Sequence, residues 1–178
     1  MTGTPPRRIA LVGAECTGKT TLAAALAERL PALWIPERLR EFCDEKGRPP
    51  RPDEQARLAA EQIERETQAM ERAARSGVGW VICDSTPLIT ALYSIEYFGD
   101  DALLAQAVAH QRGYALTLLA DVDLPWEADR FLRDGPGARA GFHLRLTRTL
   151  AAHGLPHHRV AGGLAARVEA ALAATRRL

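Results

Sequence analysis

The sequence predicts an α/β fold, in which a mostly parallel five-stranded sheet forms the middle layer of a three-layer sandwich. Apolar runs of strand length alternate with segments whose apolar residues recur at helical spacing, a pattern typical of parallel sheets with helices on both faces. The chain has 178 residues, which is the size of one ordinary domain with a sizeable core. No repeat, low-complexity tract or linker divides it, so we expect residues 1–178 to form a single domain.

The first strand, turn and helix enclose the most informative stretch of the chain. Residues 13–20, Gly-Ala-Glu-Cys-Thr-Gly-Lys-Thr, fit the pattern Gly-x-x-x-x-Gly-Lys-[Ser/Thr] at every fixed position. The apolar run 8–12 before them reads as a buried strand, and apolar residues at helical spacing follow until Pro31. The alternative, a Gly-rich turn that merely joins a strand to a helix, does not require this combination.

Such a loop binds the phosphates of a nucleoside triphosphate. Its backbone N–H groups point at the β-phosphate, and a side chain in place of Gly13 or Gly18 would obstruct the turn. Lys19 would place a positive charge between the β- and γ-phosphates, and Thr20 would offer its hydroxyl to Mg²⁺. We therefore expect a P-loop fold of the nucleoside- and nucleotide-kinase type. The residues expected to bind ATP are Gly13, Ala14, Glu15, Cys16, Thr17, Gly18, Lys19, Thr20 and Thr21.

The middle of the chain continues the alternation. Residues 33–35 read as a second short strand, followed by a turn into a brief helix over 36–42 and by an exposed Pro- and Arg-rich loop over 47–52. A long amphipathic helix is expected from about Asp53 to Arg75, with the charged pairs Glu61/Arg65 and Glu71/Arg75 on its solvated side. The residues expected on its apolar side are Ala59, Ile63, Met70 and Ala74.

The third strand, residues 80–84, is apolar and ends in a carboxylate. Thr86 and Pro87 resemble an N-cap and a first helical position, which start a helix that runs to Gly99. Asp100 or Asp101 is expected to cap the next helix, which stops at Gly113.

The last third completes the sheet. Strands are expected over 116–120 and 157–160. A helix is expected over 140–152, and it should bury Phe142, Leu146 and Leu150. A final helix is expected from about Leu164, with Val168 and Leu172 on its inner side. Between the fourth strand and its helix, residues 126–139 combine three arginines with Gly-Pro-Gly, which indicates a hinged lid.

Ligands of an open parallel sheet bind beyond the carboxyl ends of its strands, so the side chains there are the candidates for chemistry. Phosphoryl transfer requires a carboxylate that orients or deprotonates the acceptor hydroxyl. Asp84 is the first candidate for this base, although it could instead hold Mg²⁺ through water or merely cap a helix. Glu37 is the second candidate, and pairing with Arg38 or Arg40 is the alternative for it.

Arginine and aromatic side chains complete the list of candidates. Arg130 and Arg133 are three residues apart and would close over the triphosphate, unless they lie on a solvated helical face. Aromatic rings could stack on a flat acceptor, but rings at such places are more often part of a core. The aromatic candidates are Trp34, Tyr97 and Trp126. Cys16 could be a reactive thiol beside Lys19, although a passive filler of a variable loop position is the simpler interpretation.

Taken together, these residues resemble the ribosylnicotinamide kinase domain of the NadR-type NAD-salvage proteins, which are small-molecule kinases with an AAA-like ATP-binding fold. The resemblance runs from about Ile9 to Arg176. It includes the phosphate loop, the sequence Glu-x-x-Arg-Glu-aromatic at 37–42, the strand that ends at Asp84, and Pro-Trp-x-x-Asp at 125–129. The phosphate loop is a general nucleotide motif, whereas the second and fourth features together are fairly specific.

The resemblance implies ATP at residues 13–21 and Mg²⁺ near Thr20 and Asp84. It also implies a riboside acceptor contacted by Trp34, Glu37, Arg40, Asp84, Tyr97 and Trp126. Thr86 departs from the family pattern, which has a second acidic residue at this position, so a contact to a ribose hydroxyl is missing. No adenylyltransferase or helix-turn-helix sequence precedes Ile9, which implies a stand-alone kinase.

Charge and composition limit the other partners. Lys and Arg number 23 against 22 Asp and Glu, so no general electrostatic attraction to nucleic acid or to a membrane surface is expected. The polar first residues and the absence of a long apolar segment indicate a cytoplasmic protein, either a monomer or a homo-oligomer. Three cysteines without Cys-x-x-Cys spacing and the adjacent His157 and His158 give no metal pattern.

Three functions remain open at this point. The first is a ribosylnicotinamide kinase, the second a kinase of another nucleoside or vitamin alcohol, and the third a regulatory ATPase that phosphorylates nothing. The arginine-bearing lid and the acidic strand ends favour a kinase. They do not identify the acceptor, because pocket shape decides specificity. They also do not decide whether the nucleotide is ATP or GTP, or whether Asp84 or Glu37 is the base.

Overall fold

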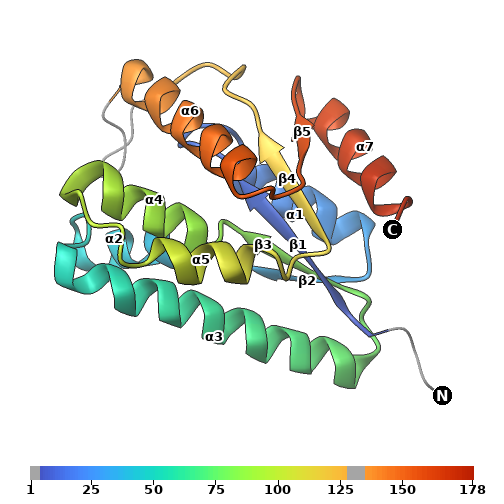
Figure 1. The fold of residues 1–178 in the computed structure, drawn as a ribbon. Helices are drawn as coiled ribbons and strands as arrows, with labels where there is room; N and C mark the ends of the chain where they lie inside the picture. Colours follow the sequence, from blue (N-terminus) through green and yellow to red (C-terminus); the bar gives the residue numbers. More distant parts are fainter. Residues whose placement is uncertain (1–4, 128–134) are drawn as a thin grey trace.

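The computed structural model describes residues 5–127 and 135–178. Within this part of the chain five strands form one sheet, in the order β2-β3-β1-β4-β5, and every neighbouring pair is parallel (Figure 1). The predicted sheet is therefore confirmed, and it is entirely parallel. The strands are β1 (Arg7–Val12), β2 (Ala32–Ile35), β3 (Trp80–Asp84), β4 (Leu116–Ala120) and β5 (His158–Val160).

Helices follow the strands as the sequence predicts. Proline stands within the first two positions of α3, α4 and α6, where its missing N–H costs no helical hydrogen bond. The helices are α1 (Lys19–Arg29), α2 (Arg38–Lys46), α3 (Pro52–Ser76), α4 (Pro87–Phe98), α5 (Leu104–Gln111), α6 (Pro136–Ala152) and α7 (Leu164–Thr175).

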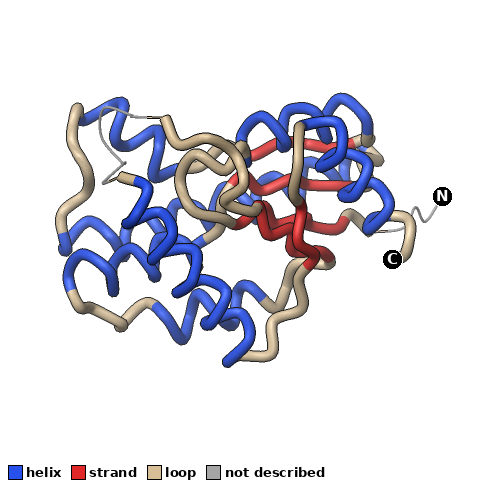
Figure 2. The backbone as a smooth tube through the Cα atoms, turned by 90° about the horizontal axis from the view of Figure 1, so that it is seen from above, coloured by secondary structure: helices blue, strands red, loops and turns tan. Residues whose placement is uncertain are grey.

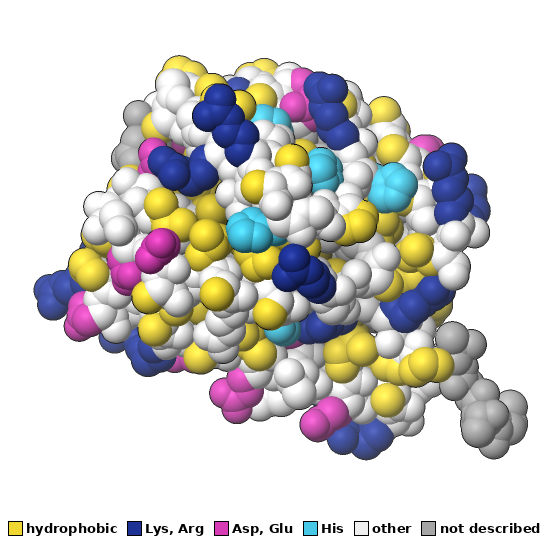
Figure 3. Space-filling model, in the orientation of Figure 1, with side chains coloured by type: hydrophobic (Ala, Val, Ile, Leu, Met, Phe, Trp, Pro, Cys, Tyr) yellow, Lys and Arg dark blue, Asp and Glu magenta, His cyan; other side chains and the backbone are white. Residues whose placement is uncertain are grey.

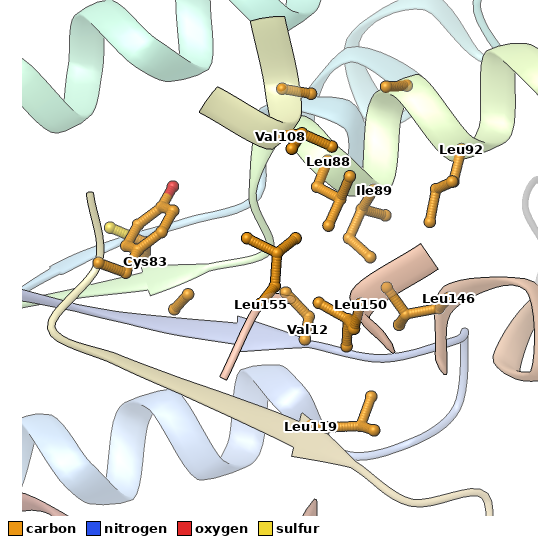
Figure 4. Packing of buried hydrophobic residues seen from close by; sticks show 14 of the residues in the cluster. Val12, Cys83, Leu88, Ile89, Leu92, Val108, Leu119, Leu146, Leu150 and Leu155 are labelled. Carbon is orange, nitrogen blue, oxygen red and sulfur yellow. The ribbon is translucent and has the colours of Figure 1, made fainter. Parts of the chain in front are cut away.

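The alternation of side chains along the strands gives the sheet two apolar faces. Ile9 and Leu11 of β1 pack against α1 and α7, whereas Ala10 and Val12 face the helices of the other side. Figure 2 shows the helices on both sides of the strands. In Figure 4, side chains from α4 and α6 converge on Val12 of β1. The predicted inward residues of the last two helices are confirmed as buried, namely Phe142, Leu146, Leu150, Val168 and Leu172.

The face that α3 buries agrees with the prediction at Ala59 and Met70 and differs from it elsewhere. Ala74 is exposed, whereas Gln62 and Glu66 are buried. Glu66 has its charge balanced inside, since it accepts hydrogen bonds from Arg8 at 3.1 Å and from the Tyr114 hydroxyl at 2.7 Å. A glutamate at helical spacing resembles a solvated residue in the sequence, because its buried partners come from distant elements.

Two helix starts also differ. Leu103 rather than Asp100 or Asp101 is the N-cap of α5, since Asp100 accepts a hydrogen bond from the Ala102 N–H in the turn before it. Helix α6 begins at Pro136, so the end of the predicted lid forms its first turn. On α3 the pair Glu71/Arg75 is confirmed at 3.8 Å.

Of the helices described, none combines the length and apolar composition that a membrane crossing requires. On the face shown in Figure 3, Lys and Arg side chains are interspersed with acidic and histidine side chains.

Candidate active site

The phosphate loop lies between the carboxyl end of β1 and the first residue of α1, Lys19. Gly18 has φ +74°, a conformation that L side chains rarely adopt. A Cβ on Gly13 would lie 2.9 Å from the Thr17 hydroxyl and 3.1 Å from Ala120, so both glycines are required sterically. The Thr17 hydroxyl donates to the Ala14 carbonyl at 2.7 Å and closes the loop on itself.

The loop borders a hollow of about 180 Å³. Its walls come from three places: the phosphate loop with the start of α1, the start of α2, and one residue of α4. The lining residues are Glu15, Cys16, Thr17, Gly18, Lys19, Thr20, Thr21, Glu37, Leu39, Arg40 and Tyr93. Seven of the nine predicted nucleotide-binding residues thus share one hollow, while Gly13 and Ala14 lie behind it.

Lys19 is folded back onto the loop. Its Nζ donates to the carbonyl oxygens of Gly13 at 2.9 Å and Ala14 at 2.8 Å. These contacts hold the ammonium group at the rim of the hollow without an opposing carboxylate in hydrogen-bond contact among the described residues. A phosphate oxygen is a stronger acceptor than a peptide carbonyl, so an entering nucleotide would draw the ammonium group toward itself.

Asp84 lies beside the loop because β3 is the neighbour of β1. It pairs in register with Leu11, two residues before Gly13. Its side chain is 1% exposed, and its Oδ1 has no hydrogen-bond partner among the described residues. The next residue, Ser85, has φ +69° although it is not glycine, a strained conformation of the kind that clusters at functional sites. Asp84 is therefore held in place with one acceptor oxygen unused.

Burial is the main reason why the pKa of the Asp84 carboxyl is raised from 3.8 to about 6, and the negative charge of Glu37 adds to this rise. Lys19, a hydrogen bond with the Thr20 side chain, and Arg40 oppose it. The two predicted Mg²⁺ ligands, Thr20 and Asp84, are thus near enough for the Thr20 side chain to lower the pKa of the Asp84 carboxyl. A buried carboxylate with a free oxygen beside a hydroxyl suits a hard cation that carries phosphate ligands.

Because the pKa of Asp84 is raised, this buried carboxyl should lower the free energy of unfolding of the nucleotide-free protein as the pH rises. Because the folded-state pKa of about 6 exceeds the ordinary 3.8, stability from this group is complete below pH 3.8 and is lost as the pH rises through 6. The difference corresponds to about 3 kcal/mol in total, with about 1 kcal/mol lost between pH 5 and pH 8. Urea unfolding of wild type and Asp84→Asn should show this slope only in wild type. Parallel pH profiles would contradict it.

Glu37 and Arg40 reach the hollow from the sheet edge. Glu37 is the N-cap of α2, directly after β2, and Arg40 lies in the first turn of that helix. Glu41 turns the other way, toward α3, where Arg65 pairs with it. Glu37 and Arg40 are near enough to shift the pKa of Asp84, in opposite directions, whereas Glu41 is paired with Arg65 away from them.

Two lining residues were not among the candidates. Leu39 comes from α2, and Tyr93 comes from α4. The Tyr93 hydroxyl donates to Glu15 at 3.4 Å, and its ring stacks on Phe142 with centroids 4.2 Å apart. Burial raises the pKa of Tyr93 well above its usual range, and Glu15 and Glu37 add to this. Its spacing of four residues from the predicted Tyr97 is the signal that could have identified it.

In the described part of the chain, none of the three aromatic candidates lines the hollow. Trp34 pairs with Ile82, whose side chain packs on α1, so it lies on that face of the edge strand. Tyr97 is exposed and stacks on Tyr93 at 5.8 Å. Trp126 is half-buried, and its Nε1 has no acceptor among the described residues.

The predicted arginine lid falls partly outside the described part of the chain. Arg130 and Arg133 lie outside the described residues. Arg139, the third arginine of the stretch, is buried and donates to the carbonyl oxygens of Leu124 at 2.9 Å and Val122 at 3.2 Å. It therefore braces the segment after β4 and does not face the hollow.

The Thr86 side chain is buried and forms its hydrogen bond inside the protein. Its hydroxyl donates to Gln111 at 2.9 Å, and the Gln111 amide donates in turn to Thr117 at 3.0 Å. Thr86 is 2% exposed. At this position the side chain serves the packing of α4, α5 and β4, and a contact to an acceptor hydroxyl must come from elsewhere.

The chain matches the model of a protein family described as AAA domain over residues 8–167. No sufficiently similar sequence is found among the curated proteins.

Solved structures share the fold. The NadR protein in complex with NR superposes with a TM-score of 0.77 at 24% identity, covering 97% of this chain and 51% of that chain. This chain thus spans about half the length of NadR. Thymidylate kinase from Candida albicans has a TM-score of 0.63 at 18% identity, with coverages of 99% and 93%. Deoxyadenosine kinase from M. mycoides, with products bound, has a TM-score of 0.57 at 12% identity, with coverages of 96% and 100%. The fold is that of the P-loop kinases.

Proposed function

The chain belongs to the AAA domain family, and from this premise we propose that it is an ATP-dependent kinase of a nucleoside-like alcohol. The first candidate acceptor is ribosylnicotinamide, which would give nicotinamide mononucleotide. The observation that carries the proposal is the position of Asp84, buried beside the phosphate loop with one carboxylate oxygen unused. A carboxylate at this place can accept the proton of an acceptor hydroxyl, and it can also help to hold Mg²⁺.

In the proposed reaction, the acceptor oxygen attacks the γ-phosphorus. The bond from this phosphorus to the oxygen that bridges it to the β-phosphate breaks, ADP leaves, and the hydroxyl proton passes to a carboxylate. A pKa of about 6 leaves Asp84 mostly ionised at pH 7 and able to accept that proton. Glu37, the second candidate for the base, lines the hollow, whereas Asp84 is buried beside the loop and is not among the lining residues.

The remaining residues supply charge and orientation. Lys19 would neutralise charge on the β- and γ-phosphate oxygens, and Arg40 would approach from the sheet edge. Thr20 would hold Mg²⁺, with Asp84 as a further ligand if Glu37 is the base, and Mg²⁺ when bound offsets charge on the phosphates. Arg130 and Arg133 remain the proposed lid residues, which would cover the transferring group.

Motifs and fold support the choice of acceptor. The phosphate loop, the Glu37 cluster and the Pro-Trp segment resemble those of the ribosylnicotinamide kinase domain. The fold is shared with the NadR protein, which binds NR. Trp126 lies in the Pro-Trp segment with a buried indole N–H that lacks an acceptor in the described residues, and we assign it to the acceptor side of the site. Trp34 and Tyr97 lie outside the hollow and are proposed as acceptor contacts from the resemblance alone.

Ribosylnicotinamide should therefore stabilise the protein when a non-hydrolysable ATP analogue is present. At a concentration of 100 times Kd, mass action adds about 2.7 kcal/mol, which is about 5–10 °C in Tm for a chain of this size. Differential scanning fluorimetry with a panel of nucleosides and vitamin alcohols measures the shift. Trp126→Ala should lose it and keep the shift caused by the nucleotide analogue alone. A larger shift with another nucleoside would replace the acceptor.

A further inference from the structure

Arg167 has the largest of the fully buried side chains, with 1% of its surface exposed. It lies in the first turn of α7, the helix that packs beside α1 (Figure 1). A buried guanidinium is costly unless its donors and its charge are matched. Its contacts therefore indicate what it is there to hold.

The guanidinium of Arg167 joins three segments of the nucleotide side of the sheet. Its Nη1 donates to the Thr17 carbonyl of the phosphate loop at 2.8 Å. Its Nε donates to the Gly162 carbonyl, in the turn before α7, at 2.7 Å. Its Nη2 donates to the Asp121 carbonyl at 3.3 Å and pairs with the Asp123 carboxylate, both just after β4.

The contact with Thr17 fixes the direction of one peptide group. In a planar trans peptide, the C=O of one residue and the N–H of the next point in opposite directions. A Thr17 carbonyl drawn toward Arg167, behind the loop, therefore turns the Gly18 N–H away from Arg167. Gly18 lines the hollow, so this N–H is directed toward the place where a phosphate would bind.

We infer that Arg167 is a positioning residue for the phosphates of the nucleotide, acting through the Thr17–Gly18 peptide. It orients an N–H donor before the anion arrives, so that this peptide needs no reorientation when the phosphates bind. The inference rests on the nucleotide site of the proposed function, and it does not depend on the identity of the acceptor.

Arg167 also connects the loop to the segment that follows β4. Asp121 and Asp123 belong to this segment, as does Leu124, whose Cδ1 lies 3.1 Å from the place of a Cβ on Gly18. One guanidinium thus fixes both the peptide that would face the phosphate and the chain that packs against it. Arg139 is different, because its short hydrogen bond of 2.9 Å goes to Leu124 and its distance to the Cys16 carbonyl is 3.5 Å.

Binding to the full-length protein without any acceptor tests this role. The probes are ADP and inorganic tripolyphosphate, which occupy the phosphate loop, and AMP, which lacks the β-phosphate. Arg167→Lys keeps the charge and loses the fork of donors, and Arg167→Met loses both. Arg159→Gln is the matched control, because Arg159 pairs with Asp121 in the same region and makes no hydrogen bond with a described residue of the loop.

Isothermal titration of Arg167→Lys should give Kd values for ADP and tripolyphosphate that are at least about tenfold above wild type, as expected for a hydrogen bond from a charged donor. The Kd for AMP should stay within about threefold, and Arg159→Gln should bind all three probes like wild type. A purely structural residue would not change affinity according to the number of phosphates. Arg167→Met should show the larger effect if it folds, and Arg167→Lys decides if it does not.

Wild-type affinity of folded Arg167→Lys for ADP and tripolyphosphate would overturn the inference, as would an equal loss for AMP. These outcomes are distinct from a failure of the proposed function. If wild type binds ADP tightly but phosphorylates no acceptor, the kinase proposal fails and the role of Arg167 stands.

Discussion

Lys19→Ala is expected to reduce ATP-dependent turnover by at least about a thousandfold, because the loop loses its one side-chain cation for the transferring phosphate. The Lys19 ammonium lies at the rim of the hollow, held by the carbonyl groups of Gly13 and Ala14. Binding of ATP should weaken as well. Coupled measurement of ADP release gives the turnover, and titration with ATP gives the affinity.

The chain offers a matched control for this variant, since its second lysine is Lys46 at the exposed end of α2. Lys46→Ala removes the same group far from the loop and should keep wild-type turnover. Wild-type turnover in Lys19→Ala would mean that the nucleotide site has been assigned to the wrong place.

Asp84→Asn is expected to lower kcat by about a hundredfold or more with the fold intact, because the substitution keeps the size of the side chain and removes its charge. The wild-type carboxylate is buried, with one oxygen unpartnered in the described part of the chain. Steady-state kinetics at saturating ATP and acceptor measures the change. An unchanged kcat would remove Asp84 from the chemistry.

Asp121→Asn is the control for a strand-end carboxylate, since Asp121 follows β4 and its carboxylate is paired with Arg159, whereas Asp84 has an oxygen without a partner among the described residues. Its kcat should stay within a few-fold of wild type. Mn²⁺ in place of Mg²⁺ separates the two tasks considered for Asp84. Recovery of the Asp84→Asn variant with Mn²⁺ indicates a metal ligand, and no recovery indicates the base.

Most of the fold could be predicted because its signals are local. Strands β3 and β4 were predicted with their observed ends, since each is a short, mainly apolar run between segments whose apolar residues recur at helical spacing. The start of α5 was not, because Asp100 uses its side chain within the turn and leaves Leu103 as the N-cap. An aspartate signals a cap or a turn equally well in a sequence.

Candidates for the site could be predicted only where they are contiguous in the sequence or stand at the end of a predicted strand. The phosphate loop and the strand-end carboxylate follow from sequence order and from the parallel topology. Tyr93 and Leu39 could not be found in this way, since the packing of α4 and α2 brings them to the hollow. Arg167 is 150 residues from Thr17, and in the sequence it resembles a solvated arginine on an amphipathic helix.

Transfer of label from [γ-³²P]ATP tests the central claim most directly, because it shows where the phosphate goes. With ribosylnicotinamide as the acceptor, the account predicts that label enters the riboside in step with ADP formation, and that little inorganic phosphate appears. Wild-type protein without acceptor and the Lys19→Ala variant are the controls. If label enters only inorganic phosphate with every nucleoside and vitamin alcohol supplied, the protein is an ATPase and the kinase account is wrong.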